Sequence, residues 1–237
     1  MVIADRIAAI RERMAAAALR AGRESKGVAL VAVSKFQPAS ALEAAYAAGQ
    51  RLFGENRVQE AEEKKRLLGS LLQGEDALRL ELIGALQSNK VRKAVAAVSR
   101  IQSIDSVELA ARVGRAAQEI GLTMPVLIQV DLAGEPAKSG VPERDLLSAL
   151  QVLRAAEGIS LDGLMAIPPF FDNPDDVRPY FARLRALKDQ GMERGLLVRG
   201  ELSMGMSHDF EAAIEEGATI VRIGTAIFGE RPPRETA

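Results

Sequence analysis

The sequence contains no cysteine and only one histidine, His208. The absence of cysteine excludes disulfide bonds, thiolate metal sites and cysteine nucleophiles, and one histidine cannot build a multi-histidine metal cluster within one chain. A chain without disulfides suits a reducing compartment, so we expect a cytoplasmic protein that holds no metal.

Long apolar runs are also missing. The longest stretch without a charged residue covers 11 residues, 120–130, whereas a helix needs ~20 to span a bilayer. Near the N-terminus, apolar residues recur at helical spacing, and charged residues interrupt any signal-peptide apolar region; the apolar positions are Ile3, Ile7, Ile10 and Met14. We therefore expect no transmembrane segment, and an N-terminal amphipathic helix that docks on the domain.

Neither sign of charge is in excess. The 31 Lys and Arg residues balance 32 Asp and Glu residues, which leaves a formal net charge of −1. Such a chain has no global basic field that would attract nucleic acid or an anionic membrane. Small-molecule partners are favoured instead.

What the sequence does contain is a repeated unit of strand followed by helix. Eight apolar runs of strand length alternate with helical patterns, at 28–35, 51–55, 79–85, 100–105, 125–132, 161–168, 201–206 and 219–227. Several helical patterns end at a glycine suited to a left-handed C-cap, at Gly49, Gly121, Gly158 and Gly191. Eight such units predict an α/β fold, a (β/α)8 TIM-type barrel with an extra N-terminal helix, and a doubly wound open sheet is the alternative. No linker divides the chain, so we expect one domain over residues 1–237.

The first predicted strand ends in Ser34 and Lys35. Barrel enzymes place their chemistry at the carboxyl ends of the strands. A lysine against apolar surroundings loses part of its preference for the charged form, and its neutral amine can form a Schiff base with an aldehyde. A lysine at this position can equally extend to water at the rim, and position alone does not separate these readings.

The last two predicted strands end in residues that suit a phosphate group. Ser203, Ser207, Gly224 and Thr225 offer hydroxyls and small-residue backbone amides, with Arg222 as a nearby cation. Ser207 alone could be a helix N-cap and Gly224 alone a turn residue, but together they favour phosphate binding. A Schiff-base lysine facing a phosphate site across one barrel mouth is the arrangement expected for pyridoxal 5′-phosphate (PLP).

Several longer motifs carry a family resemblance: "AVSK", "FGENRVQE", "IGALQSNK", "IQSID", "KSG", "GLMAI", "LSMGMSHDFEAAI" and "VRIGTAIFG". Over about residues 26–231 the sequence resembles the single-domain pyridoxal phosphate homeostasis proteins, a family with the alanine-racemase-type barrel. The family commonly has an aromatic residue or histidine before the "IG" of the third motif, where this sequence has Leu82.

The resemblance implies a set of cofactor-binding residues, which are Lys35, Asn56, Met165, Ser203, Arg222, Gly224 and Thr225. Lys35 is then the aldimine lysine that binds PLP covalently. The phosphate is held by Ser203, Gly224 and Thr225, and Arg222 lies beside the ring or the phosphate.

One of the implied positions has another interpretation. Asn56 and Met165 correspond to residues that line the family's pocket, but Asn56 could equally be a helix N-cap with Gln59 three residues on. His208 is interpreted as an exposed first-turn residue rather than a general base.

The resemblance further implies that the protein stores, buffers or delivers PLP with little or no catalysis. PLP-dependent apoenzymes are then possible recipients, and we expect a monomer. The alternatives are a PLP-dependent amino-acid racemase-like enzyme and a Schiff-base aldolase. A racemase needs a second acid/base group, yet the only tyrosines, Tyr46 and Tyr180, fall within helical patterns. An aldolase would have to use a carboxylate at a strand end, from among Glu55, Asp105 and Asp131.

Overall fold

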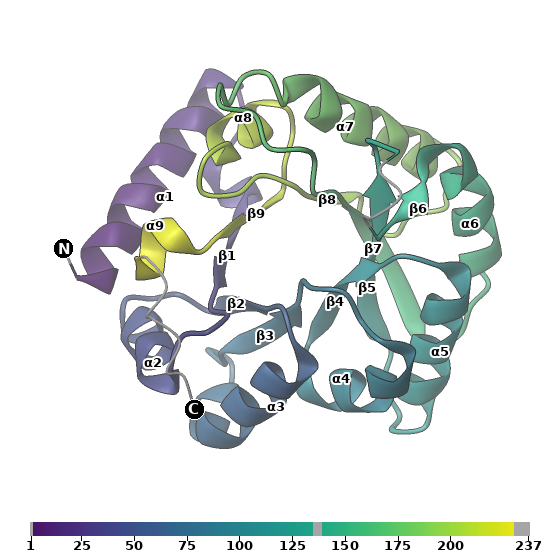
Figure 1. Cartoon of the computed structure of the whole chain (residues 1–237), viewed down its shortest axis with the longest axis horizontal. Coiled ribbons are helices and arrows are strands. Elements are labelled where there is room, and N and C mark those ends of the chain that lie inside the picture. The colour runs from purple at the N-terminus through teal and green to yellow at the C-terminus, as the bar shows by residue number, and fades with distance from the viewer. Residues whose placement is uncertain (1, 135–138, 230–237) are drawn as a thin grey trace.

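The computed structural model describes residues 2–134 and 139–229, in which eight parallel strands close into a barrel (Figure 1). The barrel strands are β1 (Ala29–Val33), β2 (Leu52–Glu55), β3 (Arg79–Leu82), β4 (Arg100–Ile104), β5 (Met124–Asp131), β7 (Ile159–Met165), β8 (Glu201–Ser203) and β9 (Ile220–Ile223). Neighbouring strands pair in parallel around the ring, and the pairing of β4 with β5 closes it. The predicted (β/α)8 barrel is confirmed and the open sheet is excluded.

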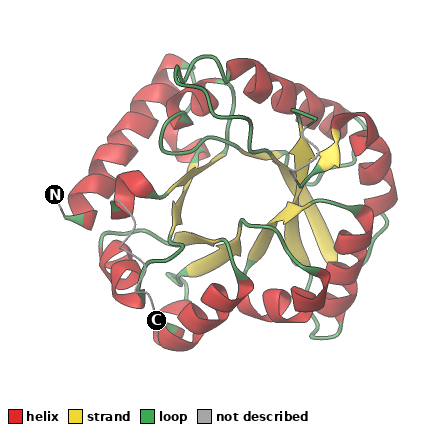
Figure 2. Ribbon diagram, in the orientation of Figure 1, coloured by secondary structure: helices red, strands yellow, loops and turns green. Residues whose placement is uncertain are grey.

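Helices surround the barrel on its outside (Figure 2). They are α1 (Ile3–Arg20), α2 (Ala39–Ala47), α3 (Val58–Leu67), α4 (Val91–Ala97), α5 (Val107–Gln118), α6 (Leu146–Leu153), α7 (Arg178–Glu193), α8 (Phe210–Glu215) and α9 (Thr225–Phe228). A two-residue strand that the sequence did not indicate, β6 (Val141–Pro142), pairs with the end of β5 outside the ring. None of the helices in the described ranges is both long and apolar enough to cross a membrane.

Side-chain alternation along the strands divides the apolar residues between two cores. In β1, Leu30 and Ala32 join the large core between the barrel and the helices, while Val31 points inward to a small cluster within the barrel. Since successive side chains of a strand point to opposite faces, one strand serves both cores. This explains why the predicted strands are apolar runs rather than alternating patterns.

The N-terminal helix is present as predicted. Ile7, Ile10 and Met14 of α1 are buried in the large core, and the helix lies beside α8 and α9 (Figure 1). Arg13 pairs with Glu211 of α8 at 2.9 Å. The helix therefore joins the first and last parts of the described chain.

The last two strands are shorter than the apolar runs that predicted them. β8 ends at Ser203 and β9 ends at Ile223, and Thr225 already begins α9. The apolar run continues past β9 because Ile227 of α9 is itself fully buried. A short run of apolar residues indicates a buried segment, but it does not distinguish a buried strand from a short buried helix.

Two of the four glycine predictions are wrong. Gly49 and Gly121 have positive φ angles just after α2 and α5, as expected of glycines that end helices. Gly158 also has a positive φ, but α6 already ends at Leu153 with Arg154 as its C-cap, and Gly191 lies inside α7. A Cβ atom at this position would lie 2.9 Å from the Leu197 Cδ1 atom. Gly191 is therefore required for close packing and not for ending the helix.

Candidate functional site

A cavity of about 260 Å³ opens at the carboxyl ends of three adjacent strands, β8, β9 and β1. Predicted site residues from two of these strand ends meet here, since Lys35 follows β1 and Gly224 and Thr225 follow β9. The complete lining consists of Val33, Lys35, Gln37, Met206, Ser207, His208, Arg222, Gly224, Thr225, Phe228 and Gly229.

Two hydroxyl groups in this lining are available to a ligand. Within the described ranges, the hydroxyls of Ser207 and Thr225 form no hydrogen bond to the protein. Ser207 is not a helix cap, because α8 begins at Phe210 and its N-cap is Asp209, whose carboxylate accepts the Met206 N–H at 2.6 Å. The capping alternative for Ser207 is thereby removed.

Gly224 forms part of the cavity wall where β9 lies close to β1. A Cβ atom here would lie 3.2 Å from both the Cβ atom and the carbonyl oxygen of Val33, which is closer than most Cβ contacts. The glycine thus exposes backbone rather than a side chain at the wall, as phosphate-binding loops do.

Arg222 brings a buried positive charge to the cavity. Its side chain donates to the Ser203 hydroxyl at 2.5 Å and to the Ala166 carbonyl oxygen at 2.9 Å. Among the described residues, no carboxylate forms an ion pair with Arg222. Burial lowers its pKa to about 10, and the more distant Asp209 carboxylate opposes this shift. The guanidinium therefore remains charged at neutral pH with only neutral groups as direct partners.

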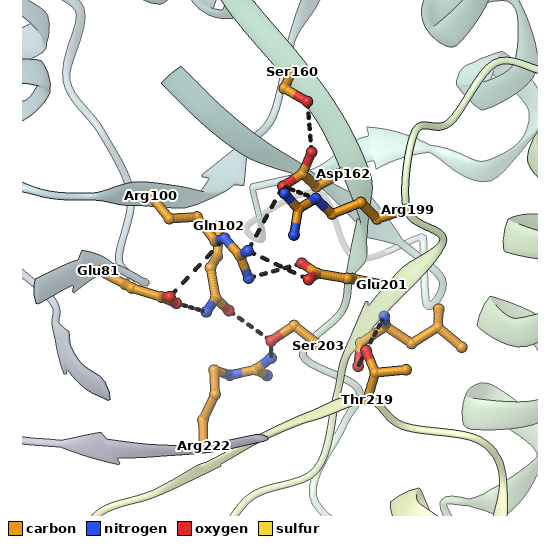
Figure 3. A network of polar contacts seen from close by, with 11 residues as sticks. Glu81, Arg100, Gln102, Ser160, Asp162, Arg199, Glu201, Ser203, Thr219 and Arg222 are labelled. Atoms are coloured by element: carbon orange, nitrogen blue, oxygen red, sulfur yellow. Dashed lines mark hydrogen bonds and ion pairs between the residues drawn. The ribbon is translucent and has the colours of Figure 1, made fainter. Parts of the chain in front are cut away.

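Ser203 lies behind Arg222 instead of at the cavity surface. The hydroxyl of this fully buried residue donates to Gln102 at 2.6 Å while it accepts the bond from Arg222. The Gln102 amide in turn donates to Glu81 at 2.5 Å. Figure 3 shows this chain of contacts running from Arg222 into the barrel. Ser203 thus holds Arg222, whereas Ser207 is the serine at the cavity.

The chain continues into a charged cluster around Arg100 (Figure 3). Arg100 and Glu201 are the first residues of β4 and β8, and Asp162 lies in the middle of β7. Arg100 lies 3.9 Å from Glu81, 3.6 Å from Asp162 and 2.7 Å from Glu201. Burial raises the pKa values of Glu81 and Glu201 above the usual range, and Arg100 opposes the shift. In this cluster the positive charge of Arg100 is balanced by protein carboxylates.

Lys35 lies in the turn after β1, between the cavity and a second, larger groove of about 770 Å³. Asn56 lines this groove at the end of β2. It does not cap α3, whose N-cap is Arg57. Lys35 therefore lines one groove with Asn56 and the other cavity with Ser207 and Thr225.

Met165 lies deeper than the sequence indicated. It is fully buried inside the barrel, where it packs with Val31, Leu127 and Ile220. The next residue, Ala166, supplies the carbonyl oxygen that accepts from Arg222. Met165 thus belongs to the packing below the site.

His208 is exposed, as expected, but it also lines the cavity. Its Nε2 atom lies 3.1 Å from the Asp172 carbonyl oxygen, and its ring lies 5.2 Å from that of Phe170. The sequence analysis assigned no cavity contact to His208. It considered Ser207 for phosphate binding, but the cofactor residues implied by the family resemblance did not include it. The available signal was their position in the loop that directly follows a predicted barrel strand.

Comparison with known proteins places this geometry in a family. Residues 6–232 match the family model described as "Alanine racemase, N-terminal domain". The chain is 41% identical over 227 residues to the pyridoxal phosphate homeostasis protein of Aquifex aeolicus, with 96% of this chain and 97% of that protein covered. It is 42% identical over 230 residues to the protein of the same name from Pseudomonas aeruginosa, with 97% and 96% covered.

A solved structure agrees with the sequence relatives. PipY of Synechococcus elongatus, whose structure has PLP bound, matches with a TM-score of 0.84 and 40% identity, covering 96% of this chain and all of that one. The chain belongs to the alanine racemase N-terminal domain family and, within it, to the pyridoxal phosphate homeostasis proteins.

Proposed function

We propose that this protein binds PLP at the barrel mouth and stores, buffers or delivers the cofactor, with little or no catalysis of its own. One observation carries the proposal: a single cavity joins a lysine, a buried arginine charge and two hydroxyls that form no hydrogen bond to any described residue. The bound PLP in the similar PipY supports it.

The donors in the cavity fit the chemistry of PLP. A phosphate dianion requires several hydrogen-bond donors, which the hydroxyls of Ser207 and Thr225 and the backbone at Gly224 provide. Lys35 offers an amine in the same cavity, and this amine would attach covalently to the aldehyde of bound PLP. Ser203 then acts through Arg222, to which it is hydrogen-bonded.

The surroundings of the ring are assigned on the same basis. Asn56 contacts the cofactor from the groove beside Lys35. Met165 supports the site from below through the packed cluster inside the barrel. Arg222 faces the ring as a charged donor that is held in place by Ser203 and Ala166.

The weak catalysis that we propose follows from Arg222. Bound PLP supplies an electron sink for carbanion chemistry, which is strong when a carboxylate keeps the pyridine nitrogen protonated and weak when an arginine faces it. Arg222 keeps its own proton at neutral pH, because its pKa is about 10. No carboxylate or tyrosine is among the described residues that line the cavity, and the titratable group that does line it besides Lys35 and Arg222 is the exposed His208.

The direct test is borohydride reduction of the purified protein with PLP, followed by peptide mass spectrometry. We expect a phosphopyridoxyl group on Lys35 and its complete loss in Lys35→Ala. Lys90→Ala is the matched control, because Lys90 lines the adjoining groove. Labelling of Lys90, or of Lys138, which lies outside the described residues, would contradict the assignment.

A second experiment separates a carrier from the two enzyme alternatives. Holoprotein is incubated with L- and D-amino acids in deuterium oxide, and we expect no rapid exchange of the α-hydrogen. Rapid exchange that is lost in Lys35→Ala would establish the racemase-like enzyme instead. A borohydride-trapped adduct with a sugar phosphate, in the absence of PLP, would favour the aldolase.

Delivery makes a further prediction. Cofactor should move to a PLP-dependent apoenzyme faster than it is released into buffer, whereas equal rates would indicate storage alone. The monomeric state, the single domain over 1–237 and the cytoplasmic location stay predictions, and light scattering on the purified protein tests the first.

A further inference from the structure

A buried polar cluster lies on the outer side of β1 and β2, directly behind Lys35. The Lys64 amine of α3 donates to the Ser34 carbonyl oxygen at 2.6 Å and to the Glu55 carboxylate at 2.5 Å. The Ser34 hydroxyl also donates to Glu55, at 2.5 Å. Ser34 and Glu55 are fully buried and Lys64 is 5% exposed.

Stability does not account for this cluster. A buried ion pair loses the hydration of both charges, and apolar side chains of similar volume are often at least as stabilising. The second carboxylate oxygen of Glu55 has no hydrogen-bond partner in the described structure, and burial raises the Glu55 pKa although Lys64 opposes this. The geometry that the cluster imposes on its neighbours is the remaining explanation.

That geometry concerns both peptide groups of Lys35. Lys64 binds the carbonyl oxygen of the Ser34–Lys35 peptide. Glu60, one helical turn earlier on α3, accepts the N–H of the Lys35–Phe36 peptide at 2.9 Å. Helix α3 thus forms hydrogen bonds to the backbone immediately before and immediately after Lys35.

The turn held in this way is a conformation that needs support. Phe36 has a φ angle of +64° and is the only described residue other than glycine with a positive φ. Bulky residues rarely adopt this left-handed conformation, and they persist in it where the surroundings impose it. The bond from Phe36 N–H to Glu60 supplies that constraint.

We propose that Lys64 and Glu60 are positioning residues that orient Lys35 toward the cofactor aldehyde, with Glu55 holding Lys64 in place. The inference rests on the proposed function, in which Lys35 is the attachment residue. The two fixed peptide planes set the direction of the Lys35 Cα–Cβ bond, and bond formation depends steeply on the approach geometry of the amine.

The test compares two ligands that differ only in their ability to react with Lys35. PLP has the aldehyde, and 4-deoxypyridoxine 5′-phosphate keeps ring and phosphate without it. The double variant Lys64→Met with Glu55→Gln removes both buried charges at nearly constant volume. We expect PLP adduct formation to fall by about tenfold to a hundredfold, while affinity for the deoxy analogue stays within about twofold of wild type.

Glu60→Ala provides a second route that does not disturb the buried pair. It removes the acceptor for the Phe36 N–H, and we expect a smaller loss in the same direction, with faster hydrogen exchange at that amide. Glu63→Ala is the matched control, since Glu63 is an exposed acidic residue of the same helix. It should change neither ligand's binding.

The outcomes are distinguishable. Unchanged adduct formation in both variants, with Lys35→Ala still abolishing it, would overturn the positioning role and leave the proposed function intact. Equal losses for PLP and the deoxy analogue would show a general structural role instead. A wild-type protein that forms no adduct on Lys35 would overturn the proposed function and this inference with it.

Discussion

Two arginines inside the barrel have different kinds of partner. Toward the amino ends of β4 and β8, the partly buried Arg100 has Glu81, Asp162 and Glu201 within 4 Å. At the carboxyl ends, Arg222 has a hydroxyl and a carbonyl oxygen as hydrogen-bond partners. In the first cluster carboxylates oppose the arginine charge directly, whereas the second presents a charge that suits an anionic ligand.

The two arginines belong to one continuous hydrogen-bond network, but we assign Arg100 a structural role and Arg222 a ligand-binding role. Gln102 and Ser203 connect the two ends, since Gln102 bonds to Glu81 and Ser203 bonds to Arg222. Buried charges that neutralise one another maintain the fold, whereas a buried charge with neutral partners has capacity left for a ligand. Substitutions at the two ends should therefore have different consequences.

The largest effect on stability is expected at the amino end. Arg100→Met leaves Glu81, Asp162 and Glu201 without their shared cation, and breaking a buried pair in this way costs about 3–5 kcal/mol. Urea unfolding measures the loss, and the folded fraction should still bind PLP. Arg92→Met is the control, because Arg92 forms an exposed pair with Glu119 and such pairs contribute ~0–1 kcal/mol.

A small loss for Arg100→Met, or PLP binding that disappears while the protein stays folded, would remove the distinction between the two ends.

The next largest effects are expected at the cavity. Ser207→Ala and Thr225→Ala each remove a hydrogen bond to the phosphate, worth about 1.5–3 kcal/mol, so PLP affinity should fall by roughly one to two orders of magnitude. Pyridoxal, which has no phosphate, should be almost indifferent to both changes. Isothermal titration with each ligand makes the comparison.

Ser203→Ala sharpens the comparison, because Ser203 is bonded to Gln102 and Arg222 and not exposed to the cavity. We expect it to weaken pyridoxal and PLP alike and to reduce stability. A loss confined to PLP would instead place Ser203 on the phosphate, as the sequence suggested.

The smallest effect concerns pH. Burial raises the pKa of Glu81 in the folded protein above the unfolded value of about 4.3. The folded state therefore binds more protons between these two pKa values, and this residue's contribution to stability falls as pH rises through that window. Glu81→Gln removes the contribution, so the variant should gain stability relative to wild type as pH increases from about 4. Urea unfolding at a series of pH values measures the difference; a difference that runs the other way would show that Arg100 dominates over burial.

Much of the fold was predictable because strand and helix patterns are local. Every predicted strand exists, and Lys35 and Thr225 both follow strands of the barrel. The boundaries were less accurate where an apolar run passed from β9 into α9, because burial selects apolar residues in both. Gly191 was misassigned for a similar reason, since its contact with Leu197 is a matter of packing.

The candidate site was predictable in its location and less so in its detail. The alternation of strands and helices places the ends of β1, β8 and β9 at one face, so Lys35 and Gly224 could be expected to meet. Which of Ser203 and Ser207 faces the cavity depends on where β8 ends and how the following loop turns. Neither the end of β8 nor the path of this loop can be predicted from the periodicity of apolar residues.

Apolar periodicity was sufficient to predict the alternation of strands and helices and the strand end that carries Lys35, because these depend on contacts with near neighbours in the chain. It favoured the barrel, but only the pairing of β4 with β5 excluded the open sheet. The partners of buried charges required the folded structure. Arg100 and Glu201 are 101 residues apart in the contact between them, and α3 reaches the peptides around Lys35 from 30 residues away. Closure of the barrel brings such groups together, and nothing short of the three-dimensional arrangement distinguishes a charge that is already neutralised from one that is available to a ligand.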